Sequence, residues 1–281
     1  MLKEIEELRI HCKRIVTGTN LFCVFLVVVT IVFDLMSSSP SRSSFFPIIV
    51  VVGLIVTTNT STRQSAIYVD EFRSAFLNRL FDKRIKLSFV EYGKGIDRYD
   101  MKEWGVIEGA DHCATRDLIE GNCFDTDFRM SFANATKNHE IYGQNAHLPQ
   151  QIPIFNGCYL MAKLKSPVQG KVFVTSDSLE VLTLKEKTFD SMFKVRCEGC
   201  DASDILSDEL KEKMLRIALK HSGAMFGVVE GWLHVAIPGY TSLAAPSLSS
   251  EVNPALIERM EKQFVELNEL ILGVCENQTG A

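Results

Sequence analysis

The hydrophobic residues of this chain are concentrated in two runs close to its start, residues 16–35 and 45–58. A serine-rich polar segment, residues 37–44, separates the two runs. In helical form the first run is about 30 Å long, which matches the hydrocarbon core of a bilayer. The second is strongly apolar over only about 12 residues, but the flanking Ser and Thr hydroxyls can bond back to the backbone and extend the helix. We therefore predict a transmembrane helical hairpin over residues 16–60.

Two other interpretations also fit the lengths of these apolar runs. The second run is short enough to be a re-entrant or buried helix. The first run could be a cleaved signal peptide, with residues 21–33 as its apolar core and 37–39 as the small residues before the cut. A long lead of mixed charge over residues 2–15, amphipathic at helical spacing, and a second apolar run directly afterwards favour a membrane anchor.

The positive charges predict the orientation of the hairpin. They are concentrated at its two ends and not at its tip. The segment before the hairpin contains Lys3, Arg9, Lys13 and Arg14, and the segment after it contains Arg63, Arg73 and Arg79. The tip contains only Arg42. Because positively charged flanks stay on the cytoplasmic side, both chain ends and the soluble part are expected in the cytoplasm. Asp34 then lies at the outer rim, where water and headgroups solvate it.

Helical spacing continues after the hairpin and predicts a stalk helix over residues 61–92. Its apolar positions are Ile67, Phe72, Phe76, Leu80, Ile85 and Phe89. A basic cluster over residues 79–86 could contact lipid headgroups, but a straight helix would carry it about 25–35 Å from the bilayer. A solvated helix face is the simpler interpretation.

Residues 93–240 predict an α+β domain of antiparallel strands flanked by helices. Glycines separate short apolar segments that are typical of strands, at 104–110, 118–132, 154–165, 171–175 and 188–197. Residues 134–153, rich in Asn, His, Gln and Pro, predict a loop. A helix with Ser207 as N-cap is expected over residues 207–221. Segments 224–229 and 232–237 predict a hairpin about Glu230-Gly231.

The C-terminal part, residues 241–281, predicts a serine-rich linker followed by a helix. Pro254 is placed at the first turn of that helix, where its missing N–H costs little, and the apolar spacing continues to Leu272. Strands first and helices around them favour an α+β arrangement over alternating βαβ units.

Several of these segments resemble a known family. The segment 154–159, Ile-Phe-Asn-Gly-Cys-Tyr, followed by Phe193-Lys194-Val195, the helix after Ala202 and the strand at 232–237, is similar to the bacterial family catalogued as domain of unknown function 3137. That family typically places the domain behind paired N-terminal membrane helices. The resemblance implies a bacterial inner-membrane protein of this architecture, and it implies no catalytic residues.

Charge and cysteine usage add to the compartment prediction. The formal net charge is −5, and from Gln64 onward 24 Lys and Arg stand against 31 Asp and Glu, so the soluble part is acidic and repels phosphate backbones. Nucleic acid is therefore not an expected partner. The 8 cysteines are scattered, with one closely spaced pair, which suits reduced cytosolic thiols better than a disulfide framework.

The one close pair, Cys197 and Cys200, is the sharpest candidate for chemistry. Two thiolates at this spacing can share a zinc ion or form a redox couple. A structural zinc needs two more ligands, and no second such pair follows. A thioredoxin-like site needs a helix at the first cysteine, whereas helical spacing begins only near Ile205. Chance spacing is favoured, with a metal or redox site as the alternative.

The remaining polar clusters are weaker candidates. Asp125 and Asp127 suit a hard cation, but on a strand they form an ordinary solvated face. His112, His139 and His147 could gather with Cys113 around a metal, although nothing in their spacing requires it. No serine-hydrolase elbow, phosphate loop or dinucleotide fingerprint is present in the sequence.

Together these patterns predict a membrane-tethered cytoplasmic module for protein interaction or assembly. We expect no catalytic residue and no cofactor, with the lipid bilayer and a protein partner or a second copy of the chain as the binding partners. The alternative is a metal- or thiol-dependent enzyme that uses Cys197 and Cys200.

Overall fold

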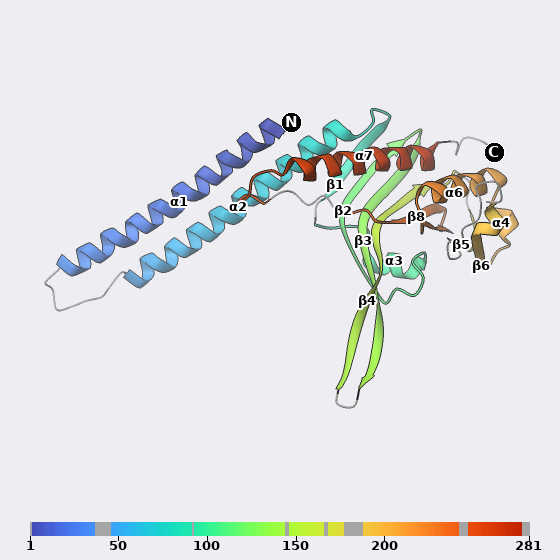
Figure 1. The fold of residues 1–281 in the computed structure, drawn as a ribbon, viewed down its shortest axis with the longest axis horizontal. Helices are drawn as coiled ribbons and strands as arrows, with labels where there is room; N and C mark the ends of the chain where they lie inside the picture. Colours follow the sequence, from blue (N-terminus) through green and yellow to red (C-terminus); the bar gives the residue numbers. More distant parts are fainter. Residues whose placement is uncertain are drawn as a thin grey trace. The chain divides into compact units, whose positions relative to one another are not determined.

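The computed structural model describes residues 2–36, 46–91, 93–143, 146–165, 168–176, 188–241 and 247–276. The chain divides into two compact units (Figure 1). The anchor unit comprises Met1–Leu80 and Ala244–Lys262, and the sheet unit comprises Phe81–Leu243 and Gln263–Ala281.

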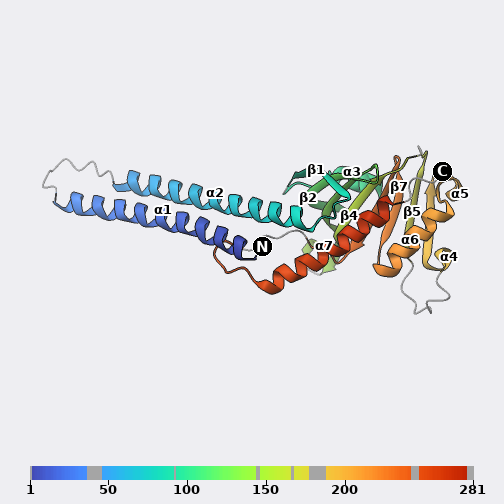
Figure 2. The ribbon, with the colours of Figure 1, turned by 90° about the horizontal axis from the view of Figure 1, so that it is seen from above.

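Two long helices make up most of the anchor unit. Helix α1, Leu2–Met36, and helix α2, Phe46–Leu80, run side by side in opposite directions (Figures 1 and 2). The predicted lead helix and the first apolar run are thus one continuous helix. The predicted tip at residues 37–44 and the side chain of Asp34 lie outside the described residues.

Both helices are long and apolar enough to cross a membrane. Their apolar windows are not buried inside the molecule. Leu21, Phe25 and Ile55 are 66%, 61% and 62% exposed, respectively. Large apolar side chains on so continuous a surface are typical of a helix that is covered by something other than water.

The stalk helix ends earlier than the sequence predicted. Helix α2 stops at Leu80, and residues Ile85–Glu91 form strand β1, so the helix expected up to residue 92 is wrong beyond Leu80. A turn intervenes in which the Asp82 carboxylate accepts a hydrogen bond from the backbone N–H of Arg84 at 2.9 Å. Such an Asp-centred turn competes with the helix, and pairing of Ile85 with Cys123 of the neighbouring strand then favours the extended backbone.

The sheet unit is built on one antiparallel sheet of 8 strands in the order β1-β2-β3-β4-β8-β7-β5-β6. The α+β prediction with antiparallel strands is therefore confirmed. After β1 the strands are β2 (His112–Cys123), β3 (Thr126–Gly143), β4 (Ala146–Lys163), β5 (Lys171–Ser176), β6 (Phe193–Glu198), β7 (Met225–Val229) and β8 (Trp232–Pro238). The predicted hairpin between β7 and β8 is also confirmed, with Glu230 and Gly231 both at positive φ.

Four secondary-structure predictions need correction. The strand expected at 188–197 begins with a short helix, Phe189–Met192, and is extended only from Phe193 onward. The single strand expected over residues 118–132 is a hairpin of β2 and β3, because Phe124 and Asp125 adopt positive φ and reverse the chain. The strand expected at 104–110 is wrong: Trp104 is the last residue of helix α3, Arg98–Trp104, which Gly105 closes in the left-handed region, and residues 105–110 form turns and irregular backbone. The described residues of the loop expected at 134–153 belong instead to β3 and β4, which pair as a long hairpin. Their sequence is polar, which is typical of a loop, so the strands were not predicted.

Helices cover both faces of the sheet (Figure 2). On one face lie α6 (Asp208–Lys220) and the second half of α7 (Pro254–Cys275), with Met214 and Phe264 fully buried. Ser207 caps α6 as predicted by accepting a hydrogen bond from the N–H of Leu210. On the other face α3 and the chain around it pack on a second core. Two further short helices are α4 (Phe189–Met192) and α5 (Ala202–Ile205).

Strands β3 and β4 continue well past the rest of the sheet (Figure 1). Strand β2 pairs with β3 only as far as Thr136, and β8 pairs with β4 only from Gly157 onward. Residues 137–143 and 146–152 therefore form a two-stranded extension, which we call the ribbon. At about 3.3 Å per residue the ribbon is about 20–25 Å long.

Candidate functional site

The predicted thiol pair occupies the turn after edge strand β6. Cys197 lies in β6 and Cys200 follows Gly199, which has a φ of 73°. The two thiols interact, which contributes to the raised pKa of Cys197, and the Cys200 thiol donates a hydrogen bond to the backbone oxygen of Lys171 at 3.4 Å. Burial, followed by the neighbouring Cys200, raises the pKa of the Cys197 thiol. The turn thus favours two hydrogen-bonded thiols rather than the thiolate that metal binding or redox catalysis uses.

The structure does not complete a metal site around the predicted ligands. Within the described ranges no three His, Cys, Asp or Glu side chains come together in a way that could hold a metal ion. Asp125 sits in the β2–β3 turn, and Asp127 points outward from β3, where it accepts a hydrogen bond from the Asn122 amide. The side chains of His139 and His147 lie outside the described residues.

A second thiol pair was not visible in the sequence, because its members are far apart in the chain. Cys275, at the end of α7, and Cys123 of β2 interact with each other, and both side chains are almost fully buried. Burial raises the pKa of Cys275 to about 12 and also raises the pKa of Cys123. Lys213 of α6 donates to the backbone oxygen of Val274 at 3.0 Å and so caps the C-terminal end of α7. Inert thiols and a capping lysine indicate a structural role.

A buried polar cluster lies beneath α3. The Tyr159 hydroxyl and His234 Nδ1 are 2.9 Å apart, and His234 Nε2 is 3.4 Å from the backbone oxygen of Val229. Since that carbonyl only accepts, Nε2 carries the proton and Nδ1 accepts from the tyrosine. Trp104 covers the pair, with its ring centroid 4.8 Å from that of His234. Burial lowers the pKa of His234 to about 4, so the imidazole is neutral at physiological pH. Both ring nitrogens of this core histidine therefore have hydrogen-bond partners, and its burial leaves a substrate no access to it.

An ion pair fixes the start of α1 to a distant segment of the anchor unit. Arg9 is 5% exposed, and its guanidinium donates to both carboxylate oxygens of Glu6 and to the backbone oxygen of Leu248 at 3.2 Å. The Glu6 carboxylate also accepts from the N–H of Val252 at 3.4 Å. Arg9, which the sequence suggested only as one of several flanking charges, therefore holds the segment that precedes α7.

Three exposed cations lie at one level of the two long helices. Helices α1 and α2 contact each other at Cys23 and Gly53, where a Cβ added to Gly53 would lie 3.7 Å from the Cβ of Cys23. Because the two antiparallel helices both rise by about 1.5 Å per residue, residues equally far before Cys23 and after Gly53 lie at the same height. Lys13 and Arg14 are therefore level with Arg63. We call these three residues the collar. None of them has an ion-pair partner among the described residues. The sequence contains no Asp or Glu over residues 8–33 or 46–69. Glu6 interacts electrostatically with Lys13, but its carboxylate is already paired with Arg9.

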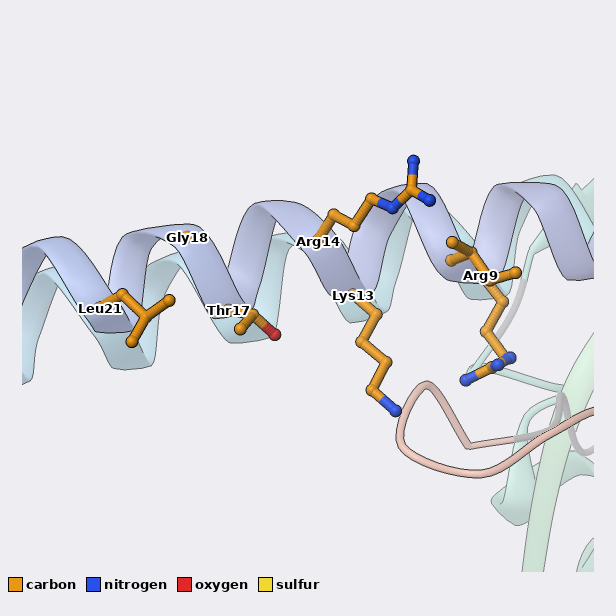
Figure 3. A pocket seen from close by; sticks show the side chains of 7 residues that line it. Arg9, Lys13, Arg14, Thr17, Gly18 and Leu21 are labelled. Carbon is orange, nitrogen blue, oxygen red and sulfur yellow. The ribbon is translucent and has the colours of Figure 1, made fainter.

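An open pocket lies on α1 beside the collar (Figure 3). Polar and basic residues line one end of it and small or apolar residues the other: Arg9, Ile10, Lys13, Arg14, Thr17, Gly18 and Leu21. Figure 3 shows Lys13 and Arg14 leaving one turn of the helix in different directions. The pocket therefore begins among cations and ends on the apolar run.

The two edges of the ribbon differ in what they offer a further strand. The outer N–H of Asn138 donates to the Asp111 carboxylate at 2.8 Å, just where β2 ends. Because outward groups alternate along a strand, the backbone of Glu140 also points outward from β3, and its partner Pro149 points outward from β4. Pro153 occupies an outward position on β4 as well, through its pairing with Thr136. Prolines thus remove N–H donors from the β4 edge, while the β3 edge keeps them.

The comparisons with known proteins add no relatives. No family model, no curated protein and no solved structure matches this chain.

Proposed function

We propose that this chain is an inner-membrane protein of bacteria in which a helical hairpin anchors a cytoplasmic module for protein interaction or assembly. Both chain ends and the sheet unit lie in the cytoplasm in this proposal. The resemblance to the family of domain of unknown function 3137 is part of it and stays a prediction.

The anchor is supported by the exposed apolar surfaces of α1 and α2. From Ile15 to Met36 helix α1 is about 33 Å long, close to the thickness of a bilayer core. The collar marks one end of both apolar runs, and positively charged ends remain on the cytoplasmic side. Placing the collar there puts the chain ends and the sheet unit on the same side.

The interaction role rests on one observation, the open outer edge of β3 in the ribbon. A two-stranded hairpin with water on both faces is marginally stable by itself. Both edges of the main sheet are blunted. The outer strand β6 carries the exposed charges Lys194, Arg196 and Glu198, and β1 contains a bulge after Leu87. Strand β3 carries Lys137 and Glu140 in the ribbon, and its pairing with β4 is irregular only at the base of the ribbon, between Ala135 and Thr136. No proline removes an N–H from its outer edge between Lys137 and Gly143, so an extended segment of a partner can pair with it through backbone hydrogen bonds.

A proline substitution at the edge tests the interaction role. Glu140→Pro removes an outward N–H of β3 and leaves the β3–β4 hydrogen bonds intact. We expect a protein that co-purifies with the wild-type chain from native membranes, or a second copy of the chain, to be lost from this variant. Pro149→Ala, which adds an N–H to the opposite edge, serves as the matched control and should retain it. Equal association of wild type and Glu140→Pro would contradict the proposal.

A separate measurement tests the anchor. A reporter fused after Ala281 should be protected from reagents added outside intact cells, and the protein should resist extraction from membranes by alkaline carbonate. An accessible reporter would refute the orientation, whatever the ribbon does.

A further inference from the structure

We propose that the pocket on α1 binds an anionic phospholipid, with the phosphate held by Lys13, Arg14 and Thr17 and an acyl chain lying over Gly18 and Leu21. This inference rests on the proposed function, because it requires α1 to cross a membrane. It adds a specific lipid ligand to the anchor.

The polar end of the pocket suits a phosphate group. Lys13 and Arg14 are exposed, and neither has an ion-pair partner in the part of the chain that the structure describes. Arg9 also lines the pocket, but Glu6 and Leu248 already use its guanidinium. Lys13 and Arg14 therefore present two adjacent cations, and the acidic side chain that interacts electrostatically with Lys13, Glu6, is itself paired with Arg9. An anion is the complementary ligand.

The direction of the side chains places these charges at headgroup height. Helical side chains point back toward the N-terminus of their helix, so Lys13 and Arg14 extend away from the apolar run and toward the water side. Figure 3 shows the two side chains extended in different directions, and both are exposed, long and flexible enough to turn toward a phosphate beside the exposed hydroxyl of Thr17, one turn further along. The three groups together supply charge and a hydroxyl donor.

The other end of the pocket suits a hydrocarbon chain. Gly18 has no side chain, and a Cβ added there would meet nothing within 4 Å, so the surface is open at this point. Leu21 follows at 66% exposure and continues onto the apolar run. A free phosphate would use only the basic end, whereas a phospholipid covers both ends. The apolar continuation therefore favours the lipid.

Lipid retention by the full-length protein tests the proposal. The protein is reconstituted in a roughly four-to-one mixture of phosphatidylcholine and phosphatidylglycerol, re-extracted under mild conditions, and the retained lipids are counted by mass spectrometry. We expect enrichment of phosphatidylglycerol over the input ratio. Loss of one cation should weaken this binding about fivefold, the factor that about 1 kcal/mol per cation at a membrane surface corresponds to. Lys13→Gln/Arg14→Gln should therefore abolish the enrichment, and Lys13→Arg should retain it.

A matched control distinguishes this pocket from other cations. Lys83→Gln/Lys86→Gln removes the same charge from two exposed lysines outside the pocket and should keep the enrichment. Loss in the control and not in the pocket variant would overturn the assignment. Thermal stabilisation by inorganic phosphate in pure phosphatidylcholine, with no phosphatidylglycerol enrichment, would also overturn it. A protein that fails to float with pure phosphatidylcholine vesicles refutes the anchor itself, whereas flotation without enrichment refutes only the lipid site.

Discussion

The buried His234 makes a prediction about stability as a function of pH. Its pKa in the folded protein is about 4, against an ordinary value of 6.5. The unfolded chain therefore takes up the proton first as the pH falls. The stability that comes from keeping this imidazole neutral is present above pH 6.5, is lost as the pH falls toward 4, and does not decrease further below that.

The size of the loss follows from the two pKa values. At about pH 5 the histidine of the unfolded chain is almost fully protonated, whereas that of the folded protein is about nine-tenths neutral. The corresponding loss in free energy of unfolding between about pH 7.5 and about pH 5 is about 2 kcal/mol. This interval lies above the range in which most carboxylates titrate, so His234 can be separated from them.

The assay is urea unfolding of the full-length protein in detergent, followed through tryptophan fluorescence because Trp104 contacts His234. His234→Asn keeps an acceptor near the position of Nδ1 and cannot titrate, so its stability should change by about 2 kcal/mol less over this interval than that of the wild type. Tyr159→Phe is the comparison that keeps the imidazole. It should be less stable by about 1–3 kcal/mol at every pH, because it leaves a buried acceptor without its donor, yet retain the pH dependence. Identical pH dependence in the wild type and His234→Asn would refute the reasoning.

Three further predictions test the structure at separate points. Gly157→Ala should cost about 3 kcal/mol in thermal unfolding, since its Cβ would overlap the backbone oxygen of Ile237, whereas Gly273→Ala meets nothing within 4 Å and should be neutral or stabilising by up to about 1 kcal/mol. Cys200→Ser should alter stability by less than about 0.5 kcal/mol, and metal analysis should find no zinc in the wild type; stoichiometric zinc lost from the variant would support the enzyme alternative. Lys213→Met should lower stability by about 1–2 kcal/mol, because the last carbonyls of α7 lose their donor, and unchanged hydrogen exchange at that helix end would count against the cap.

The sequence predicted best where one physical signal dominates. The two long apolar helices, the β7–β8 hairpin and the Ser207 cap all follow from local patterns and were found as expected. The helix predicted beyond Leu80 failed because its spacing was also compatible with a strand, and the residues of β2 that pair with it lie 27 to 38 residues further along the chain. Tertiary pairing overrides local spacing in such cases.

The candidate sites show the same division. The Cys197 and Cys200 pair was visible because it is local, and its thiol character follows only from the burial and hydrogen bonding that the fold supplies. Pairing of Cys123 with Cys275 depends on α7 returning to the sheet, which no spacing rule predicts. In the ribbon one signal was present and missed. Pro149 and Pro153 are four residues apart and therefore share one strand edge, a pattern that protects an edge strand as well as marking a loop.

The position of the polar groups argues for function at the periphery of this molecule. Each candidate for chemistry inside the sheet unit already has a protein partner: His234 has Tyr159, and the Cys275 thiol has Cys123. A group whose hydrogen bonds are satisfied by a fixed neighbour has little to gain from a ligand, because binding would first have to break that bond. The cations of the collar and the outward N–H groups of β3 beyond Asn138 are in the opposite position, because no ion pair or hydrogen bond within the described residues occupies them. An anionic lipid and an extended backbone are the ligands that these two sets of groups fit, and each can be removed by a substitution that leaves the core untouched.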